Sequence, residues 1–237
     1  MFARLNTYSI GLNRQELRNG RYFGQFKTTV YETSYRHIEF WRRYRILSEG
    51  AIARMSEAEL TSELFVLILD GLQDKKTSLD EFYGNLDDYW GTDPRFWRAK
   101  RDSRRPAIWL DREETVRRFD TTLSAIAESV GELIPRSSFR RPALFYSLFS
   151  VVYHRLYGVN AVTELDSPQR PLTAKSKRRL WEAVEEVSQL LTEKPSPESV
   201  PSRDRDLLIA SASQTDNLLP RQVRLEQLWN RANLSAE

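Results

Sequence analysis

The first 24 residues hold the side chains best suited to binding an anion or the edge of a base. The candidate site combines arginine, amide and carboxylate groups: Arg4, Asn6, Gln15, Glu16 and Arg18. If residues 14 to 19 are helical, Arg14 and Arg18 lie four apart on one face, with Gln15 on a neighbouring face. An arginine fork can grip a phosphate while amides orient it. The alternative is structural: the glutamate caps the helix, the asparagine organises a turn, and the arginines are solvated or pair with carboxylates.

A second candidate is the stretch from 94 to 106, where six basic residues surround two aromatic rings and Asp102 is the only acid. Such a pattern suits single-stranded nucleic acid, because the charges contact the backbone and the rings stack on bases. The residues predicted to make these contacts are Arg95, Trp97, Arg98, Arg101, Arg104 and Arg105. The alternative is a solvated loop that Phe96 and Trp97 anchor to the core.

Three smaller basic clusters also occur. They are Arg42, Arg43 and Arg45; Arg140 and Arg141; and Lys175, Lys177, Arg178 and Arg179. The last cluster lies in the first turns of a predicted helix, where the helix dipole disfavours cations unless an anion binds there. A surface helix also tolerates that cost.

The composition excludes several kinds of site. The chain has no cysteine, which excludes disulfides, thiolate zinc sites and a cysteine nucleophile. Its two histidines, His37 and His154, have no HxxxH or HExxH partner. No glycine-rich phosphate loop, nucleophile elbow or kinase signature is present. We therefore expect no catalytic residue, no metal site and no cofactor held by this chain alone.

Length and charge set the broad class. A chain of 237 residues with 40% hydrophobic residues can bury a substantial core. Its formal net charge of +3 is too small to make non-specific nucleic-acid binding the default interpretation. No apolar run approaches the roughly 20 residues that span a bilayer, and the sequence does not open with a signal-peptide pattern. We expect a cytoplasmic protein without membrane contact.

Capping signals and apolar spacings predict the helices that position these side chains. Asn13 and Glu16 form a capping-box pattern, which predicts a short helix from near Arg14 to near Gly20. The helix opened by Ser56 is apolar on more than one stripe, so we expect it to be central. The other predicted helices cover 24–45 with a break near 34–37, a run capped by Ser78, a run from Asp111 to Gly131, then 142–157, 173–191, 203–212 and 220–232.

The predicted fold class is mainly α, a multi-helical bundle in which any β structure is confined to the first dozen residues. Residues 1–90 would form a motif segment plus a first helical subdomain. Residues 91–109 would be a basic connector, and residues 110–237 a second helical subdomain. The alternative is one continuous domain that includes both subdomains.

The opening segment resembles a motif of the GmrSD restriction endonuclease N-terminal-domain family, also known as domain of unknown function 262. Phe2–Asn6, a glycine-containing turn and Leu12–Asn19 match the pattern of that family in residue type and spacing. The segment Ser211–Asp216, with the following basic helix that contains Arg221 and Arg224, is similar to the end of the family's helical region.

The resemblance implies the helical portion of a protein whose other part is a nucleotide-hydrolysing domain similar to the ParB and sulfiredoxin fold. The aspartate-glycine-glutamine-glutamine-arginine motif of that domain is absent from this sequence, and so is the His-Asn-His nuclease domain that many members carry. The chain is therefore expected to be a truncated or split member that is not catalytic alone.

The setting that the resemblance implies is a bacterial, restriction-like defence system, in which this chain is an accessory or partial module that responds to nucleotide or DNA. Its expected partner is the ParB-like domain or a protein encoded upstream, with DNA as a further candidate ligand. Nucleotide binding is expected only together with that domain. The alternatives are a self-contained helical protein-interaction module and a non-specific DNA-binding protein.

Overall fold

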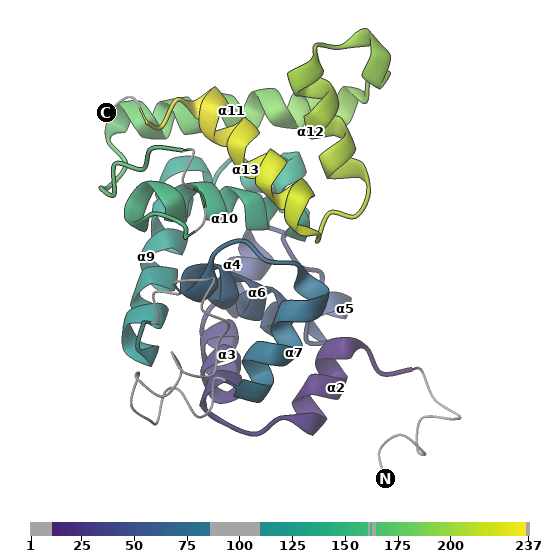
Figure 1. Ribbon diagram of the computed structural model, residues 1–237, viewed down its shortest axis with the longest axis vertical. Coiled ribbons are helices and arrows are strands. Elements are labelled where there is room, and N and C mark those ends of the chain that lie inside the picture. Colours follow the sequence, from purple (N-terminus) through teal and green to yellow (C-terminus); the bar gives the residue numbers. More distant parts are fainter. Residues whose placement is uncertain (1–10, 86–109, 161, 163–164, 236–237) are drawn as a thin grey trace.

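The computed structural model describes residues 11–85, 110–160, 162 and 165–235, and these contain helices but no strand (Figure 1). The mainly α prediction is therefore confirmed for the described residues. The α-helices are α2 (Arg14–Arg21), α3 (Gln25–Arg36), α4 (Ile38–Arg43), α5 (Glu49–Ile52), α6 (Ser56–Asp70), α7 (Lys75–Asn85), α9 (Arg112–Val130), α10 (Pro142–Tyr157), α11 (Ala174–Glu193), α12 (Ser202–Ala212) and α13 (Leu218–Ala232). Three 3-10 turns are η1 (Ile134–Arg136), η2 (Ser138–Arg140) and η3 (Pro197–Ser199).

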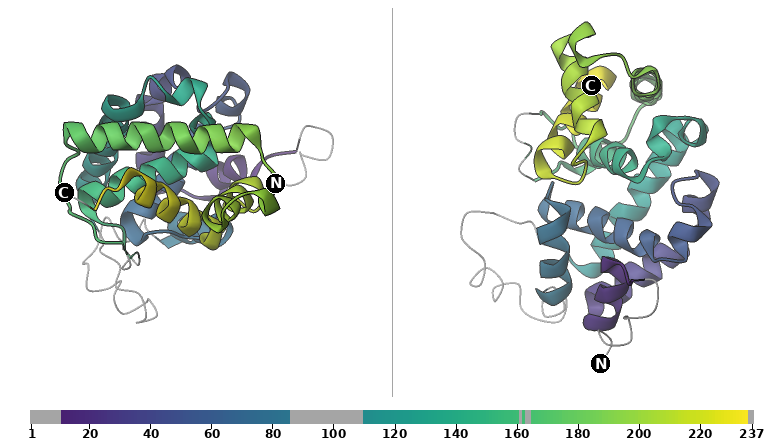
Figure 2. Two further views of the ribbon diagram at one scale, coloured as in Figure 1. Left: turned by 90° about the horizontal axis from the view of Figure 1, so that it is seen from above. Right: turned by 90° about the vertical axis from the view of Figure 1, so that its right-hand side faces the viewer.

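The helices α2 to α7 and the helices α10 to α13 gather at opposite ends of the molecule, and α9 connects them (Figure 1). Helix α9 packs against α6, α10 and α11. Seen from above, α11 lies across the second end (Figure 2). Phe119 of α9 contacts Phe65 of α6 and Phe149 of α10, with ring centroids 5.4 and 5.7 Å apart. One hydrophobic core therefore continues through both ends.

Local signals explain several helix starts. The Asp111 side chain accepts a hydrogen bond from the Glu114 N–H at 2.6 Å, and Thr173 caps α11 in the same way at 3.2 Å. The predicted starts at both residues are confirmed. The predicted break between 34 and 37 is also confirmed, because α3 ends at Arg36 and α4 begins at Ile38.

Helix α6 is central, as its apolar sequence predicts, and almost every residue from Ala58 to Asp70 is buried. It ends at Gly71, whose φ of +80° favours glycine. A Cβ atom at this position would lie 2.4 Å from the backbone oxygen of Asn160. The loop after α10 therefore packs directly on the end of α6.

Some predicted boundaries were wrong. Ser56 is the first helical residue of α6 and not its cap, because Met55 takes a left-handed conformation with φ 62° immediately before it. Helix α7 begins at Lys75, three residues before the predicted cap Ser78. Lys75 is held by Glu63 of α6 and by Asp216 of the turn before α13, so tertiary contacts extend the helix beyond its local start signal. The single turn α5 was not predicted.

His154 connects α10 to the loop that follows it and to α13. Its Nδ1 accepts a hydrogen bond from the Val159 N–H at 2.9 Å, and its Nε2 lies 3.1 Å from the Leu165 carbonyl oxygen. Its ring contacts Trp229 with centroids 4.6 Å apart. The neutral ring with a proton on Nε2 satisfies both hydrogen bonds, whereas a second proton would place Nδ1–H against N–H. Burial lowers the pKa of His154.

We expect the free energy of unfolding to fall as the pH drops below about 6.5, the ordinary pKa of histidine. The unfolded chain binds the proton more readily than the folded chain, so acid favours unfolding, by up to about 1.4 kcal/mol per pH unit. Urea unfolding at pH 7.5 and 5.5 measures this loss. It should persist in His37→Gln and largely disappear in His154→Gln; an equal pH dependence in both variants would contradict the assignment.

Candidate functional site

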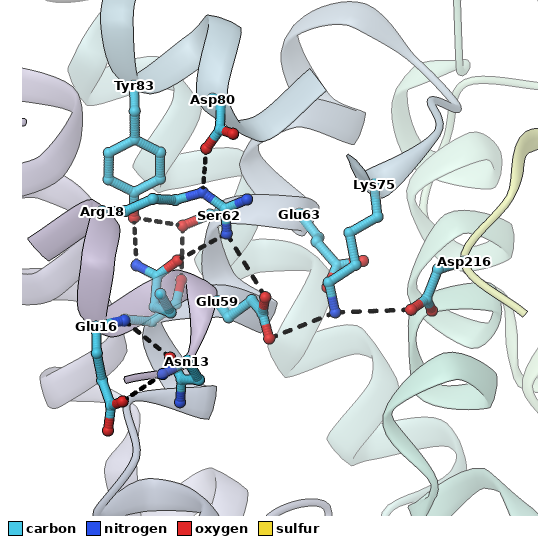
Figure 3. Close-up of polar contacts among 12 residues, drawn as sticks. Asn13, Glu16, Arg18, Glu59, Ser62, Glu63, Lys75, Asp80, Tyr83 and Asp216 are labelled. Carbon is cyan, nitrogen blue, oxygen red and sulfur yellow. Dashed lines mark hydrogen bonds and ion pairs between the residues drawn. The ribbon is translucent and has the colours of Figure 1, made fainter. Parts of the chain in front are cut away.

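Helix α2 turns two of its polar side chains, Gln15 and Arg18, toward the protein interior. Gln15 and Arg18 are only 1% and 3% exposed. The amide nitrogen of Gln15 donates to the Tyr83 hydroxyl at 2.7 Å. The Arg18 Nε donates to Asp80 at 2.6 Å, and its Nη1 lies 3.6 Å from Glu59 (Figure 3). Both side chains are thus bound within the chain and do not face solvent.

Glu16 completes the predicted capping box. Its carboxylate accepts from the Asn13 N–H at 2.6 Å, and the Asn13 side chain accepts from the Glu16 N–H at 2.8 Å. The same carboxylate accepts from Arg54 Nε at 2.9 Å. The hydrogen bond from Arg54, followed by that from the Asn13 N–H, lowers the pKa of Glu16. Its carboxylate therefore stabilises the start of α2, while Arg4 and Asn6 lie outside the described residues.

A chain of ion pairs crosses α6, and we call it the α6 ion-pair network (Figure 3). Glu59 and Glu63 lie one turn apart on α6, and Lys75 Nζ is 3.4 and 3.0 Å from their carboxylates. Burial opposes the charge of Lys75, but the carboxylates around it raise its pKa. The members of the network are Arg18, Glu59, Glu63, Lys75, Asp80, Asp216 and Arg221.

Two arginines of α13 are also internal. Arg221 is hydrogen-bonded to Glu63, donates to the Gln73 carbonyl oxygen at 2.9 Å, and lies 3.9 Å from the Tyr146 ring centroid. Arg224 donates to the Ser147 hydroxyl at 2.8 Å and to two backbone carbonyl oxygens. Burial lowers the pKa of Arg224 to about 10. The opening segment, through Arg18, and the closing segment, through Arg221, therefore meet in one network across α6.

The opening segment presents apolar side chains to solvent. Leu12, Leu17 and Phe23 are 39%, 51% and 78% exposed. Helix α2 thus buries Gln15 and Arg18 while its one apolar side chain, Leu17, is exposed, which is the reverse of an ordinary surface helix. Sequence reasoning concentrated on the polar residues and missed the exposed leucines and phenylalanine. The available signal was the position of Leu17, between the two residues that are now found buried.

The structure describes the basic cluster at the start of α11 but not the basic stretch from 94 to 106. Arg95, Trp97, Arg98, Arg101, Arg104 and Arg105 lie outside the described residues, so DNA contact through them stays a prediction. At the start of α11, Lys177 pairs with Glu128 at 2.8 Å and Arg178 pairs with Glu182 at 2.9 Å. These pairs offset the unfavourable position of cations at a helix N-terminus.

Among the described residues, no group of three or more histidine, aspartate or glutamate side chains could hold a metal ion. No helix in the same ranges is both long and apolar enough to cross a membrane.

Comparison with protein-family models, with curated proteins and with solved structures finds no match to this chain. The likeness to the GmrSD N-terminal-domain family therefore depends on the two segments quoted above. The geometry adds that residues of both segments belong to one ion-pair network and that the first exposes Leu12 and Leu17.

Proposed function

We propose that the chain is a helical accessory module that binds a nucleotide-hydrolysing partner domain through the outward face of residues 11–24. The setting is the bacterial, restriction-like defence system that the resemblance implies, in which hydrolysis belongs to the complex and not to this chain alone. The observation that supports the proposal is that this segment buries Gln15 and Arg18 while it exposes Leu12, Leu17 and Phe23.

The anchoring of α2 makes its outward face suitable for docking. Arg18 and Gln15 attach the helix to α6 and α7, and the Asn13 amide donates to the Arg54 carbonyl oxygen at 2.7 Å. A rigid element loses little conformational entropy when a partner binds. Scattered exposed apolar residues are ordinary, but several on one short anchored segment suit a protein interface.

The test is co-purification with the protein encoded immediately upstream, which this proposal takes to be the ParB-like domain, followed by gel filtration and an assay of nucleotide hydrolysis. We expect a stable complex that hydrolyses nucleotide. The double variant Leu17→Ser, Phe23→Ser should weaken the complex at least about tenfold, because truncated apolar anchors typically cost more than 1 kcal/mol of binding. Tyr35→Ser is the matched control, since Tyr35 is also an exposed aromatic residue but belongs to α3.

Two outcomes would count against the proposal. If the purified chain and the ParB-like domain elute separately at micromolar concentration, the partner is wrong and a self-contained interaction module becomes the better interpretation. If the complex forms but tolerates the double variant as well as it tolerates Tyr35→Ser, the docking face is wrong.

A further inference from the structure

A cleft of about 510 Å³ lies where the two ends of the molecule meet. One wall comes from residues 45–51, α6 and Lys75, and the other from the junction of η2 and α10. The volume is within the range of small-molecule sites. Its basic lining residues, besides Lys75, are Arg45, Arg140 and Arg141. Members of two small basic clusters in the sequence, Arg45 and Arg140, which are 95 positions apart, therefore line one cleft.

The free charge of the cleft is positive. Its two carboxylates, Glu59 and Glu63, belong to the α6 ion-pair network and already pair with cations. The three arginines are exposed, and none makes an ion pair within the part of the chain that the structure describes. Arg141 donates one long hydrogen bond, 3.4 Å, to the Ser138 carbonyl oxygen. Partial burial lowers its pKa with no carboxylate to offset the effect.

Arg45 occupies a backbone position that favours glycine. The Arg45 N–H donates to Arg42 and the Ile46 N–H to Trp41, both at 3.0 Å, which is the hydrogen-bond pattern of a Schellman motif at the end of α4. Arg45 is its left-handed residue, with φ 55°. An arginine there is strained relative to its ordinary conformations. The strain is tolerated at a residue that lines the cleft.

Arg140 and Arg141 also lie at a place where the local electrostatics are unfavourable for a cation. Arg141 is the N-cap residue of α10 and offers no capping hydrogen bond, and the first turn of that helix has no acidic residue. A cation at a helix N-terminus is unfavourable, and an anion placed there would relieve both the dipole and the repulsion between the arginines. The volume of the cleft, the arginines without an ion-pair partner among the described residues and the strained position of Arg45 therefore all favour an anion as the ligand.

We propose that this cleft binds an organic phosphate, with the phosphate held by Arg45, Arg140 and Arg141. Guanidinium groups bind phosphate oxygens bidentately and keep their charge at all physiological pH values. Apolar side chains in the lining, Ile46, Leu47 and Leu60, would cover the organic part of the ligand. This site shares no residue with the docking face of residues 11–24, so the inference stands apart from the proposed function.

The experiment compares ATP, pyrophosphate and inorganic phosphate as probes of the purified chain, by calorimetry and by thermal shift. We expect ATP to bind and to raise Tm, more than inorganic phosphate does. Arg45→Gly and Arg141→Ala should each weaken ATP binding at least about tenfold, because each variant loses a charge-assisted hydrogen bond to the phosphate.

Arg45→Gly separates binding from folding. Glycine takes the left-handed conformation without strain, which stabilises the folded state, but it also raises the conformational entropy of the unfolded chain. Because these two effects oppose each other, the Tm of the variant without ligand should not fall. The matched control is Lys194→Gly, which removes a positive charge from another left-handed position, φ 46°, outside this cleft. That control should keep the ATP affinity of the unmodified chain.

Three results would overturn the proposal. The first is no binding of ATP or pyrophosphate at millimolar concentration. The second is equal affinity for ATP and inorganic phosphate, which would show that the organic part of the ligand does not contribute to binding. The third is an Arg45→Gly variant that folds and binds ATP as well as Lys194→Gly does. If the chain binds duplex DNA but not ATP, the proposal is also wrong, because the ligand of the cleft would then be a nucleic-acid backbone.

Discussion

Replacing Arg221 by methionine is expected to lower the free energy of unfolding by about 3–5 kcal/mol. Arg221 and Glu63 are both buried, and the substitution leaves the carboxylate without its hydrogen-bonded partner. Lys75 remains 3.0 Å from that carboxylate, so the loss should fall near the lower end of the range. Urea unfolding followed by tryptophan fluorescence gives the value.

The control for this prediction is Arg42→Met. Arg42 also makes short ion pairs, 2.8 Å to Glu39 and to Glu49, but on an exposed surface where such pairs contribute little. We expect unfolding of that variant to match the unmodified chain closely. The double variant Arg221→Met, Glu63→Met should recover part of the loss, because it removes the unpaired charge. A loss below about 1 kcal/mol in Arg221→Met would contradict the network's importance.

Truncation of Phe119 to alanine should also cost about 3–5 kcal/mol. Its ring is completely buried and contacts Phe65, Phe149 and His37. These contacts join α9 to α6, to α10 and to the end of α3, so the cavity would open where the two ends of the molecule meet. Removing the ring loses both its transfer free energy and its packing with neighbours that cannot fully collapse.

Chemical denaturation measures the Phe119 effect against two controls. Phe119→Leu keeps most of the apolar volume and should lose clearly less stability. Tyr35→Ala removes an aromatic ring of similar size from an exposed position and should be close to neutral. Equal losses in Phe119→Ala and Tyr35→Ala would show that α9 does not connect a shared core.

Helix starts that depend on a local hydrogen bond could be predicted from the sequence. Asn13, Asp111 and Thr173 each cap a helix with a side chain a few residues from its partner, so the pattern is readable locally. The start of α7 at Lys75 could not be predicted, because contacts with distant carboxylates hold it. Helix α6 was predicted as central, but its left-handed entry at Met55 has no sequence signature.

The geometry of the candidate sites also depends on contacts between residues that are far apart in the sequence. The polar residues of α2 could be singled out, but their orientation depends on Asp80 and Tyr83, more than 60 positions away. Arg45 and the pair Arg140 and Arg141 were visible only as separate basic clusters. Their meeting in one cleft depends on the packing of α10 beside α6, which no local pattern contains.

The α6 ion-pair network also bears on how the chain folds during synthesis. Glu63 and Arg221 are 158 positions apart, so the carboxylate is made long before its buried partner leaves the ribosome. Contacts of such high sequence separation form late, because a long loop must close first. Helix α6 would therefore wait in a partly hydrated state until α13 is complete. Pairing of α13 with α6 through these two residues would then be the late step of folding that completes the native packing of the bundle.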